Sequence, residues 1–370
     1  MALISTEQLK KVIETYLDET DINMDSDAYA ALDKVSAVTG LMNKIAATFT
    51  IEGDYTEEGL ADLDGPEITN GNALEEYFRD FIEPQDFDET GTNTLAPSYP
   101  HEAPVSYSVE QGKQTFKTTE RMSGYSQSFN SKEEEAVYVA GIARRLYDSE
   151  TLWKNQLKKE MLGIVATAHT LNPTKTYAAA TASTLKIGEK VKDSAGAVYV
   201  VRKAISNNTE LATAVDNGQL VKLDLATSMA VPTDATTGEA FIKSVKDYVA
   251  KFMKPRSGYS LNGNIAGKGT YKLYIKEGIL PSIDVDTMAG AFNQDRLTFG
   301  VPVVEVTDFG ANENVFAMLV DTRGIRVSNV EKIATSQLNG EGAFVNYYLH
   351  ERPLAHWSPN VKVHVWNKAQ

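Results

Sequence analysis

The sequence contains no cysteine, and this absence removes several kinds of chemistry at once. Disulfide bonds, thiolate catalysis and zinc or iron–sulfur sites built on cysteine are excluded for this chain of 370 residues. Long apolar runs are missing too, because no stretch approaches the roughly 20 residues that a helix needs to cross a bilayer. Met1–Glu7 has no basic region followed by an apolar stretch, so we expect no signal peptide and no membrane association.

Positive charge is scarce in comparison with negative charge. The chain has 36 Lys and Arg residues against 50 Asp and Glu residues, a net charge of −14. Proteins whose main task is to bind nucleic acid need clustered cations that displace counterions, so that class is not expected. Apolar residues nevertheless make up 42% of the chain, enough for a sizeable core. We therefore expect an acidic globular protein of two or three domains that is made in the cytoplasm.

The common catalytic and cofactor motifs are also absent. Gly263–Gly269 resembles a phosphate-binding loop, but three residues separate Gly263 from Gly267, where the motif requires four. Gly269 also replaces the hydroxyl residue of the motif, so we interpret this stretch as a flexible loop. No HExxH or GxSxG motif occurs, which removes two frequent signatures of hydrolases.

Acidic residues and histidines show no convincing metal site. Asp21–Asp27 has the alternation of the first calcium ligands, but Ser26 takes the turn-glycine position and Leu32 replaces the bidentate glutamate. Asp284 and Asp286 precede a helical pattern and fit helix capping better than metal binding. The histidines lack metal-binding spacing and are expected to be structural: His101, His169, His350, His356 and His364. We predict no catalytic, cofactor-binding or metal-binding residues, no cofactor and no enzymatic activity.

The first third of the chain has the pattern of arms. Two amphipathic helices are predicted over residues 5–17 and 29–45, and each has one apolar stripe that needs a partner. Residues 51–90 contain fourteen acidic side chains and only one basic side chain, Arg79. We interpret this stretch either as a solvated acidic surface or as a segment that contacts a basic surface on a neighbouring copy or partner.

Residues 66–120 have the pattern of a long excursion with extended arms. Three prolines, Pro97, Pro100 and Pro104, lie in a stretch that predicts an extended tip. Alternating apolar and polar side chains predict a strand over 105–109, and a second β-rich run covers 115–119. A monomeric globule has little use for such an arm, because the arm exposes unpaired strand edges.

Residues 131–226 are predicted to contain two helices and then a group of short β segments. Ser131 and Glu134 form a capping box for a helix that should end at Asp148–Ser149, before a second helix that carries Trp153. Residues 184–226 combine two turn signals with short β segments between low-complexity flanks, which is typical of a small inserted β-rich domain.

The last third has an α/β pattern. Apolar residues at helical spacing predict a helix that carries Phe241, Val245, Val249 and Phe252. Strands are expected at 271–275, 302–306, 315–320, 342–350 and 361–366.

Three groups of segments carry a family resemblance: residues 71–77 with 85–88, residues 114–131 with the helices that follow, and residues 283–293 with 320–321 and 346–348. In order and spacing they resemble the major capsid proteins of tailed bacteriophages with the Hong Kong 97-type fold. The likeness is to the phi-29-type short-tailed phages. The first group resembles the outgoing arm of the extended loop, the second its return arm and the spine helix, and the third the axial domain and final strands.

The resemblance implies an α+β fold of the Hong Kong 97 type with a small inserted β-rich domain. The implied divisions are an N-terminal helical arm (1–65), an extended loop (66–120), a peripheral domain with the spine helix (121–173), the inserted domain (174–230), an axial domain (231–321) and the final peripheral strands (322–370).

The same resemblance implies a shell subunit that packs as hexamers and pentamers in an icosahedral head around double-stranded DNA, without specific DNA binding. The implied partners are further copies of the chain, a scaffolding protein, a portal protein and a decoration or head-fibre protein. The protein would be made in the host cytoplasm and end in the virion.

Other classes stay open at this point. An encapsulin-like nanocompartment shell would share the fold but enclose enzymes. A surface carbohydrate-binding protein would use the small β module and would be a stable, exported monomer. A hydrolase with a dispersed site has nothing specific in its favour.

Overall fold

The computed structural model describes residues 58–68, 73–78, 105–109, 112–121, 132–170, 172–281, 283, 299–310, 312–342 and 344–369. The chain divides into two compact units. Among the described residues, the first unit comprises 113–153 and 332–351, and the second comprises the remainder. The helices predicted over 5–17 and 29–45 lie outside the described residues.

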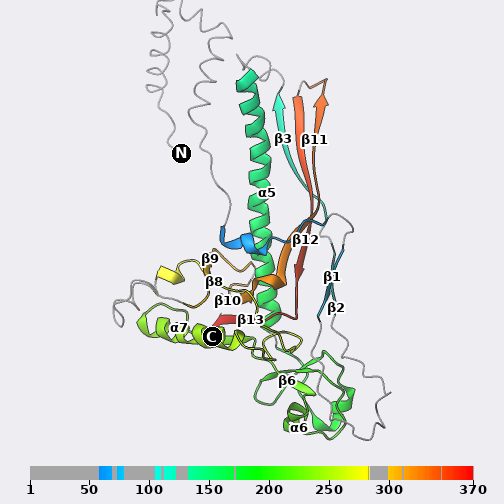
Figure 1. The fold of residues 1–370 in the computed structure, drawn as a ribbon, viewed down its shortest axis with the longest axis vertical. Helices are drawn as coiled ribbons and strands as arrows, with labels where there is room; N and C mark the ends of the chain where they lie inside the picture. Colours follow the sequence, from blue (N-terminus) through cyan, green and yellow to red (C-terminus); the bar gives the residue numbers. More distant parts are fainter. Residues whose placement is uncertain are drawn as a thin grey trace, which may run out of the picture. The chain divides into compact units, whose positions relative to one another are not determined.

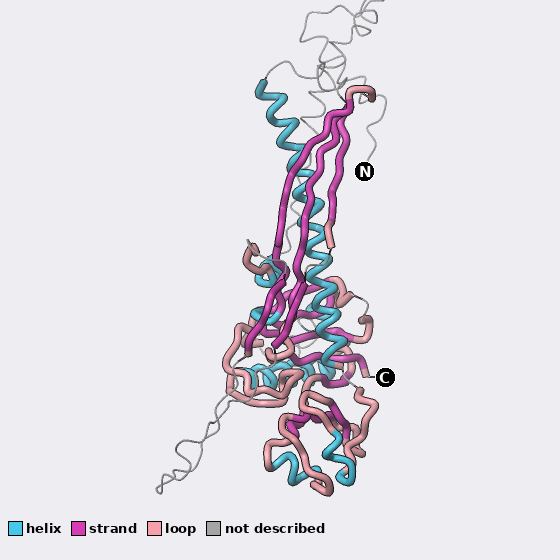
Figure 2. Tube along the Cα trace, turned by 90° about the vertical axis from the view of Figure 1, so that its right-hand side faces the viewer, coloured by secondary structure: helices cyan, strands magenta, loops and turns pink. Residues whose placement is uncertain are grey.

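The first unit contains parts of one helix and one antiparallel sheet. Helix α5 (Lys132–His169) and strands β3 (Gln114–Arg121), β11 (Ile325–Asn339) and β12 (Phe344–Trp357) contribute, and the division between units falls within α5, β11 and β12. The strand order is β11-β12-β3, as Figure 2 shows for the long strands. The rings of Phe116 on β3 and Trp153 on α5 meet edge to face at 6.1 Å. The runs predicted at 115–119 and 342–350 are therefore confirmed as strands, whereas β11 was not predicted.

The break predicted at Asp148–Ser149 is wrong, because α5 is a single helix of 38 residues. Ser149 Oγ donates to the carbonyl of Arg145 at 2.8 Å, and Thr151 Oγ1 donates to the carbonyl of Tyr147 at 3.0 Å. Hydroxyl side chains that bond back to the preceding turn are accommodated inside a helix. The polar cluster therefore does not end it.

The second unit is built on a five-stranded mixed sheet. Its strands, in spatial order, are β7 (Ala226–Met229), β13 (Val363–Lys368), β10 (Val315–Asp321), β8 (Tyr271–Lys276) and β9 (Val303–Val306). The central strand β10 is buried at every residue and pairs antiparallel with β13 and β8. The strands predicted at 271–275, 302–306, 315–320 and 361–366 are confirmed. The chain's late strand β13 lies inside the sheet, between β7 and β10.

Helix α7 (Ala235–Phe252) packs on this sheet (Figure 1). Asp234 and Thr237 form a capping box, in which Asp234 Oδ1 accepts from the Thr237 backbone N–H at 2.8 Å. The predicted apolar stripe is buried, and Phe241 contacts the rings of Phe316 and Trp366. Each such side chain contributes on the order of 2 kcal/mol by leaving water.

None of the helices in the described ranges has the length and apolarity that a membrane span requires.

A small antiparallel sheet lies within residues 174–230. It consists of β4 (Lys190–Lys192), β5 (Val198–Val201) and β6 (Leu220–Lys222), with a 3-10 turn (Ala179–Thr184) and a short helix α6 (Leu211–Asp216) beside it. We call residues 174–224 the module. The predicted β segments are confirmed, whereas α6 was not predicted.

The module packs on both of its faces. Tyr199 and Val201 of β5 face the module's own core, and Val200 faces a second cluster with Leu223, Leu225 and Leu261. Gly263 lies against this second face with φ +65°, and a Cβ there would come within 2.6 Å of Val200 Cγ1. The loop predicted at 263–269 therefore packs closely on the module at its first residue.

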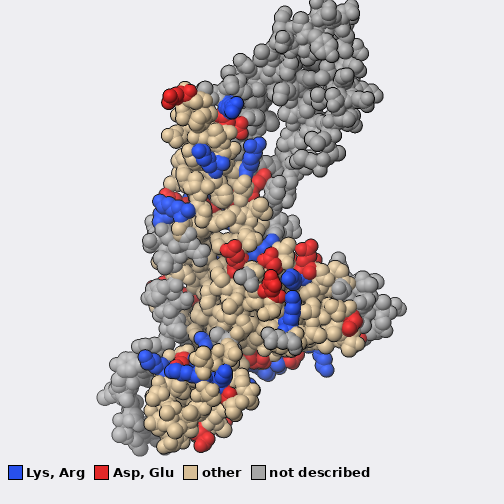
Figure 3. Space-filling model, turned by 180° about the vertical axis from the view of Figure 1, so that it is seen from behind, with Lys and Arg blue, Asp and Glu red and all other residues tan. Residues whose placement is uncertain are grey.

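The module also differs from the rest of the chain in charge. It contains seven Lys and Arg residues and five acidic residues within a chain of net charge −14. Figure 3 shows basic side chains in a row along this part of the protein. The module thus departs from the acidic character of the chain as a whole.

Burial favours the neutral ring at two histidines of the second unit. His364 donates from Nδ1 to the carbonyl of Asp224 at 3.3 Å, and its Nε2 accepts from Thr227 Oγ1 at 3.0 Å. Burial lowers the pKa of His364 to about 3 and the pKa of His169 to about 4. The nearby positive charge of Lys251 acts on the pKa of His364 in the same direction.

These two histidines predict a loss of stability in mild acid. Unfolded histidine titrates near pH 6.5, so from there down to about pH 4 the unfolded chain binds protons that the folded chain excludes. Over this range each buried neutral ring lowers the free energy of unfolding by about 1.4 kcal/mol for each pH unit of acidification. We expect the melting temperature to fall between pH 6.5 and 4.5, and to fall less steeply in His364→Gln. Parallel pH profiles for the two proteins would contradict this assignment.

Candidate functional site

The β1–β2 ribbon is a two-stranded extension of the second unit. Strands β1 (Ala73–Tyr77) and β2 (Val105–Val109) pair antiparallel from Ala73 opposite Val109 to Tyr77 opposite Val105 (Figure 1). This confirms the strand predicted at 105–109, while the tip predicted around Pro97, Pro100 and Pro104 lies outside the described residues. An isolated two-stranded ribbon is marginally stable in water, so its contacts with the rest of the unit determine how firmly it is held.

The side chain of Glu76 is the main attachment of the ribbon. Leu74 and Glu76 are partly covered, whereas Tyr77 is 67% exposed. One oxygen of Glu76, Oε2, pairs with His356 Nε2 at 2.7 Å. The other, Oε1, accepts from Ser358 Oγ and, at 3.4 Å, from Asn360 Nδ2. One carboxylate of the ribbon thus meets three donors from the end of β12 and the residues that follow it.

The ring of His356 links both strands of the ribbon. Its Nδ1 lies 2.7 Å from Ser108 Oγ on β2, while its Nε2 faces Glu76 on β1. A serine hydroxyl can both donate and accept, so it can match either role of the facing ring nitrogen. One ring thus contacts both strands of the ribbon.

Hydrogen bonds keep Glu76 ionised. Burial by itself would raise the pKa of Glu76, but the bonds from His356, Ser358 and Asn360 outweigh it, and the pKa lies below the ordinary value of 4.5. A carboxylate with a lowered pKa stabilises the fold above its unfolded pKa and loses that contribution as the pH falls. At neutral pH the ribbon is consequently held by an ionised carboxylate.

Residues 58–68 form a second attachment, by which the segment that precedes the ribbon is held to the rest of the second unit. The 3-10 helix η1 (Glu58–Leu63) buries Leu60 and Leu63 almost completely. The backbone N–H groups of Gly65 and Ile68 donate to the carbonyls of Val327 and Asn329 at 2.8 and 2.9 Å. Apolar burial and backbone pairing together fix this segment.

Two ion pairs add to this second attachment. Asp62 Oδ2 pairs with Lys272 Nζ at 2.5 Å, and Asp64 Oδ1 pairs with Lys158 Nζ at 2.7 Å. The side chain of Lys158 is only 5% exposed, so its ammonium group depends on Asp64 for compensation. Removing one partner of a buried charge leaves the other uncompensated, which is costly.

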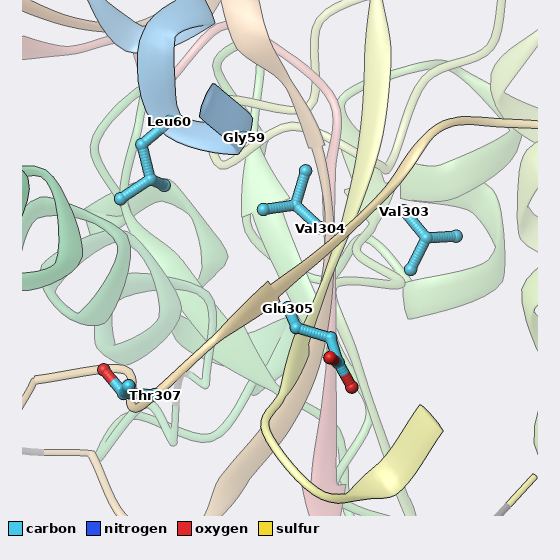
Figure 4. A pocket seen from close by; sticks show the side chains of 6 residues that line it. All are labelled: Gly59, Leu60, Val303, Val304, Glu305 and Thr307. Atoms are coloured by element: carbon cyan, nitrogen blue, oxygen red, sulfur yellow. The ribbon is translucent and has the colours of Figure 1, made fainter. Parts of the chain in front are cut away.

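A shallow pocket of about 350 Å³ lies between η1 and β9. Gly59 and Leu60 line one side, and Val303, Val304, Glu305 and Thr307 line the other (Figure 4). Glu305 is its single titratable lining group. The pocket brings no acid–base pair or nucleophile together, so its geometry indicates a packing groove.

The histidines and acidic residues that were weighed as possible ligands lie in several different places. His169, His356 and His364 are buried, and His350 bonds through its ring nitrogens to Thr115 and Thr335. His101, the calcium-like segment 21–32, and Asp284 with Asp286 lie outside the described residues. Among the described residues, no cluster of three or more His, Asp or Glu side chains could hold a metal ion.

Glu76 and its partners were not predicted as a site. Glu76 is separated from Ser358 by 282 residues and from Asn360 by 284, so no local spacing could have indicated the contacts. The signal that existed was the position of Glu76 in the segment 71–77, which carried the family resemblance.

Comparison with known proteins gives a family match. A family model described as Phi29-like phage major capsid protein matches residues 33–367. A search of curated proteins found no match.

Solved structures with a similar fold are phage capsids. One is the capsid structure of Staphylococcus phage Andhra, with a TM-score of 0.54 and 10% identity, covering 86% of this chain and 87% of that chain. Another is the capsid structure of the cyanophage P-SCSP1u, with a TM-score of 0.53 and 7% identity, covering 88% of this chain and 92% of that chain. At these identities the likeness concerns the fold.

The Asp64–Lys158 pair yields a test of the second attachment. Asp64→Asn leaves the Lys158 ammonium buried without its carboxylate, and should lower the free energy of unfolding by about 1–3 kcal/mol. Lys158→Met removes the charge and should cost less. The control Asp62→Asn should also cost less, because its partner Lys272 is 14% exposed against 5% for Lys158. Urea denaturation at neutral pH measures all three. Equal losses for Asp64→Asn and Asp62→Asn would show that burial of Lys158 does not matter.

Proposed function

The chain belongs to the Phi29-like phage major capsid protein family, and we propose that it assembles as hexamers and pentamers into an icosahedral head that encloses double-stranded DNA. The observation that carries this proposal is the family match over residues 33–367. The similar fold of two phage capsid structures supports it. The match favours a virion shell over a nanocompartment or a surface carbohydrate-binding protein.

The proposed architecture is the Hong Kong 97 type. In it, α5 is the spine helix of a peripheral domain (121–173 and 322–370), and residues 231–321 form the axial domain. The β1–β2 ribbon is the base of an extended loop (66–120), residues 1–65 are an N-terminal arm, and residues 174–230 are an insertion. The five-stranded sheet supports one adjustment, because β7 and β13 belong with the axial strands.

The proposed partners follow from a shell role. Copies of the same chain come first, with a scaffolding protein, a portal protein and a decoration or head-fibre protein as others. The role is structural and not enzymatic, and uses no cofactor. The protein is made in the host cytoplasm and ends in the virion.

The net negative charge of the chain suits a shell wall that touches packaged DNA without binding it specifically. A subunit of net charge −14 repels phosphate, so DNA can be packed and released without adhering to the wall. Overlapping arms give each subunit several weak contacts, and multivalency then makes the closed shell stable.

Assembly is the direct test of this function. We expect expression with a candidate scaffolding protein to give closed particles visible by negative-stain electron microscopy. A monodisperse monomer in sedimentation at every concentration, with the scaffold present, would overturn the proposal.

Deleting the segment beyond the ribbon tests the extended loop. Removal of Asp88–Pro104 leaves β1, β2 and the Glu76 contacts in place, so the subunit should keep its melting temperature. It should lose the ability to form shells, because the tip is expected to contact a neighbouring copy. Calorimetry and electron microscopy measure the two properties, and intact shells from the deletion would contradict this role.

A further inference from the structure

A chain of hydrogen bonds connects the module to the ribbon inside the second unit. Arg202, at the end of β5, donates from Nη1 to Asn264 Oδ1 and, at 3.2 Å, to the carbonyl of Asn262. Asn264 Nδ2 donates to Asn360 Oδ1 at 2.6 Å, and Asn360 Nδ2 donates to Glu76 Oε1 at 3.4 Å. The path thus begins on the module and ends on the carboxylate that anchors the ribbon.

The links in the middle of this path are shielded from water. Asn264 is 0% exposed and Asn360 is 1% exposed. Asn262 Nδ2 also donates to Asn360 Oδ1, at 2.9 Å. The Asn264 backbone N–H donates to Ser260 Oγ at 3.0 Å. Buried amides without water to replace a lost partner are costly to leave unpaired, so the orientation of each affects the next.

All the donors on this path point in one direction, from the module to the ribbon. Arg202 can only donate, and an ionised Glu76 can only accept. These two ends allow a single orientation of the Asn264 and Asn360 amides. Without the donor at Arg202, the buried Asn264 oxygen loses that partner, and the amide keeps its orientation only through its own donation to Asn360 Oδ1. A turned amide presents oxygen to the Asn360 oxygen, and a turn of Asn360 in response presents oxygen to Glu76.

We propose that the module positions the ribbon: Arg202 orders the Asn264 and Asn360 amides, and these hold Glu76 and hence the base of β1–β2. Arg202, Asn264 and Asn360 are positioning residues. The significance of this coupling for shell assembly rests on the proposed function, but the coupling itself is a property of the single subunit.

Hydrogen–deuterium exchange on the unassembled full chain tests the coupling. Arg202→Met removes the donors and keeps the apolar stem, and should accelerate exchange of the amides in 73–77 and 105–109 on the order of tenfold. Arg202→Lys restores one donor and should return part of the protection. Lys222→Met also replaces a basic side chain by methionine, on β6 and outside the path, and should leave the ribbon as in the unaltered chain.

A double-mutant cycle separates coupling from general destabilisation. Once Glu76→Ala has released the ribbon, adding Arg202→Met should accelerate ribbon exchange no further. Additive effects, an unchanged ribbon in Arg202→Met, or acceleration spread evenly over α7 and β10 would overturn the proposal. Because these measurements use single subunits, their outcome is independent of whether shells form, which is the test of the proposed function.

Discussion

The second unit depends on the burial of β10, whose backbone polar groups can be satisfied only by strands on both sides. β8 supplies one side and β13 the other. The segment that leads into β13 carries His356, Ser358 and Asn360, which hold the ribbon. It also carries Lys362, whose Nζ donates to the carbonyls of Phe252 and Lys254 at the end of α7, at 2.9 and 2.6 Å. Residues 356–368 therefore close the sheet, cap the helix and fix the ribbon together.

Apolar patterning in the sequence was sufficient for most of the buried elements of the second unit. α7 was predicted because its apolar residues follow the helical repeat, and β8, β9, β10 and β13 because they are short stretches rich in apolar residues; β10 is apolar at six successive positions. β11 was missed because residues 332–339 are exposed on both faces and show no alternation. The interruption expected at Asp148–Ser149 was wrong because side-chain hydroxyls bond back to α5.

The polar site could not be predicted in the same way. Glu76 and His356 are 280 residues apart, and neither has a local pattern that indicates the other. Asn264 lies in a glycine-rich stretch that resembles a phosphate-binding loop but lacks the spacing of that motif. The first of its glycines, Gly263, is explained by close approach to the module, a tertiary contact. The family resemblance supplied the functional prediction, since order and spacing over the whole chain retain information that single motifs lack.

The position of β13 in the sheet also sets an order of events during synthesis. β7 and β10 are translated before β13, yet each lacks a neighbour until residues 363–368 have been made. The same holds for the ribbon, since His356 and Asn360 emerge long after Glu76. A nascent chain that ends before Lys368 therefore has an incomplete sheet, and one that ends before His356 also has an unattached ribbon. The sheet and the ribbon can therefore be completed only after almost the whole chain has been translated.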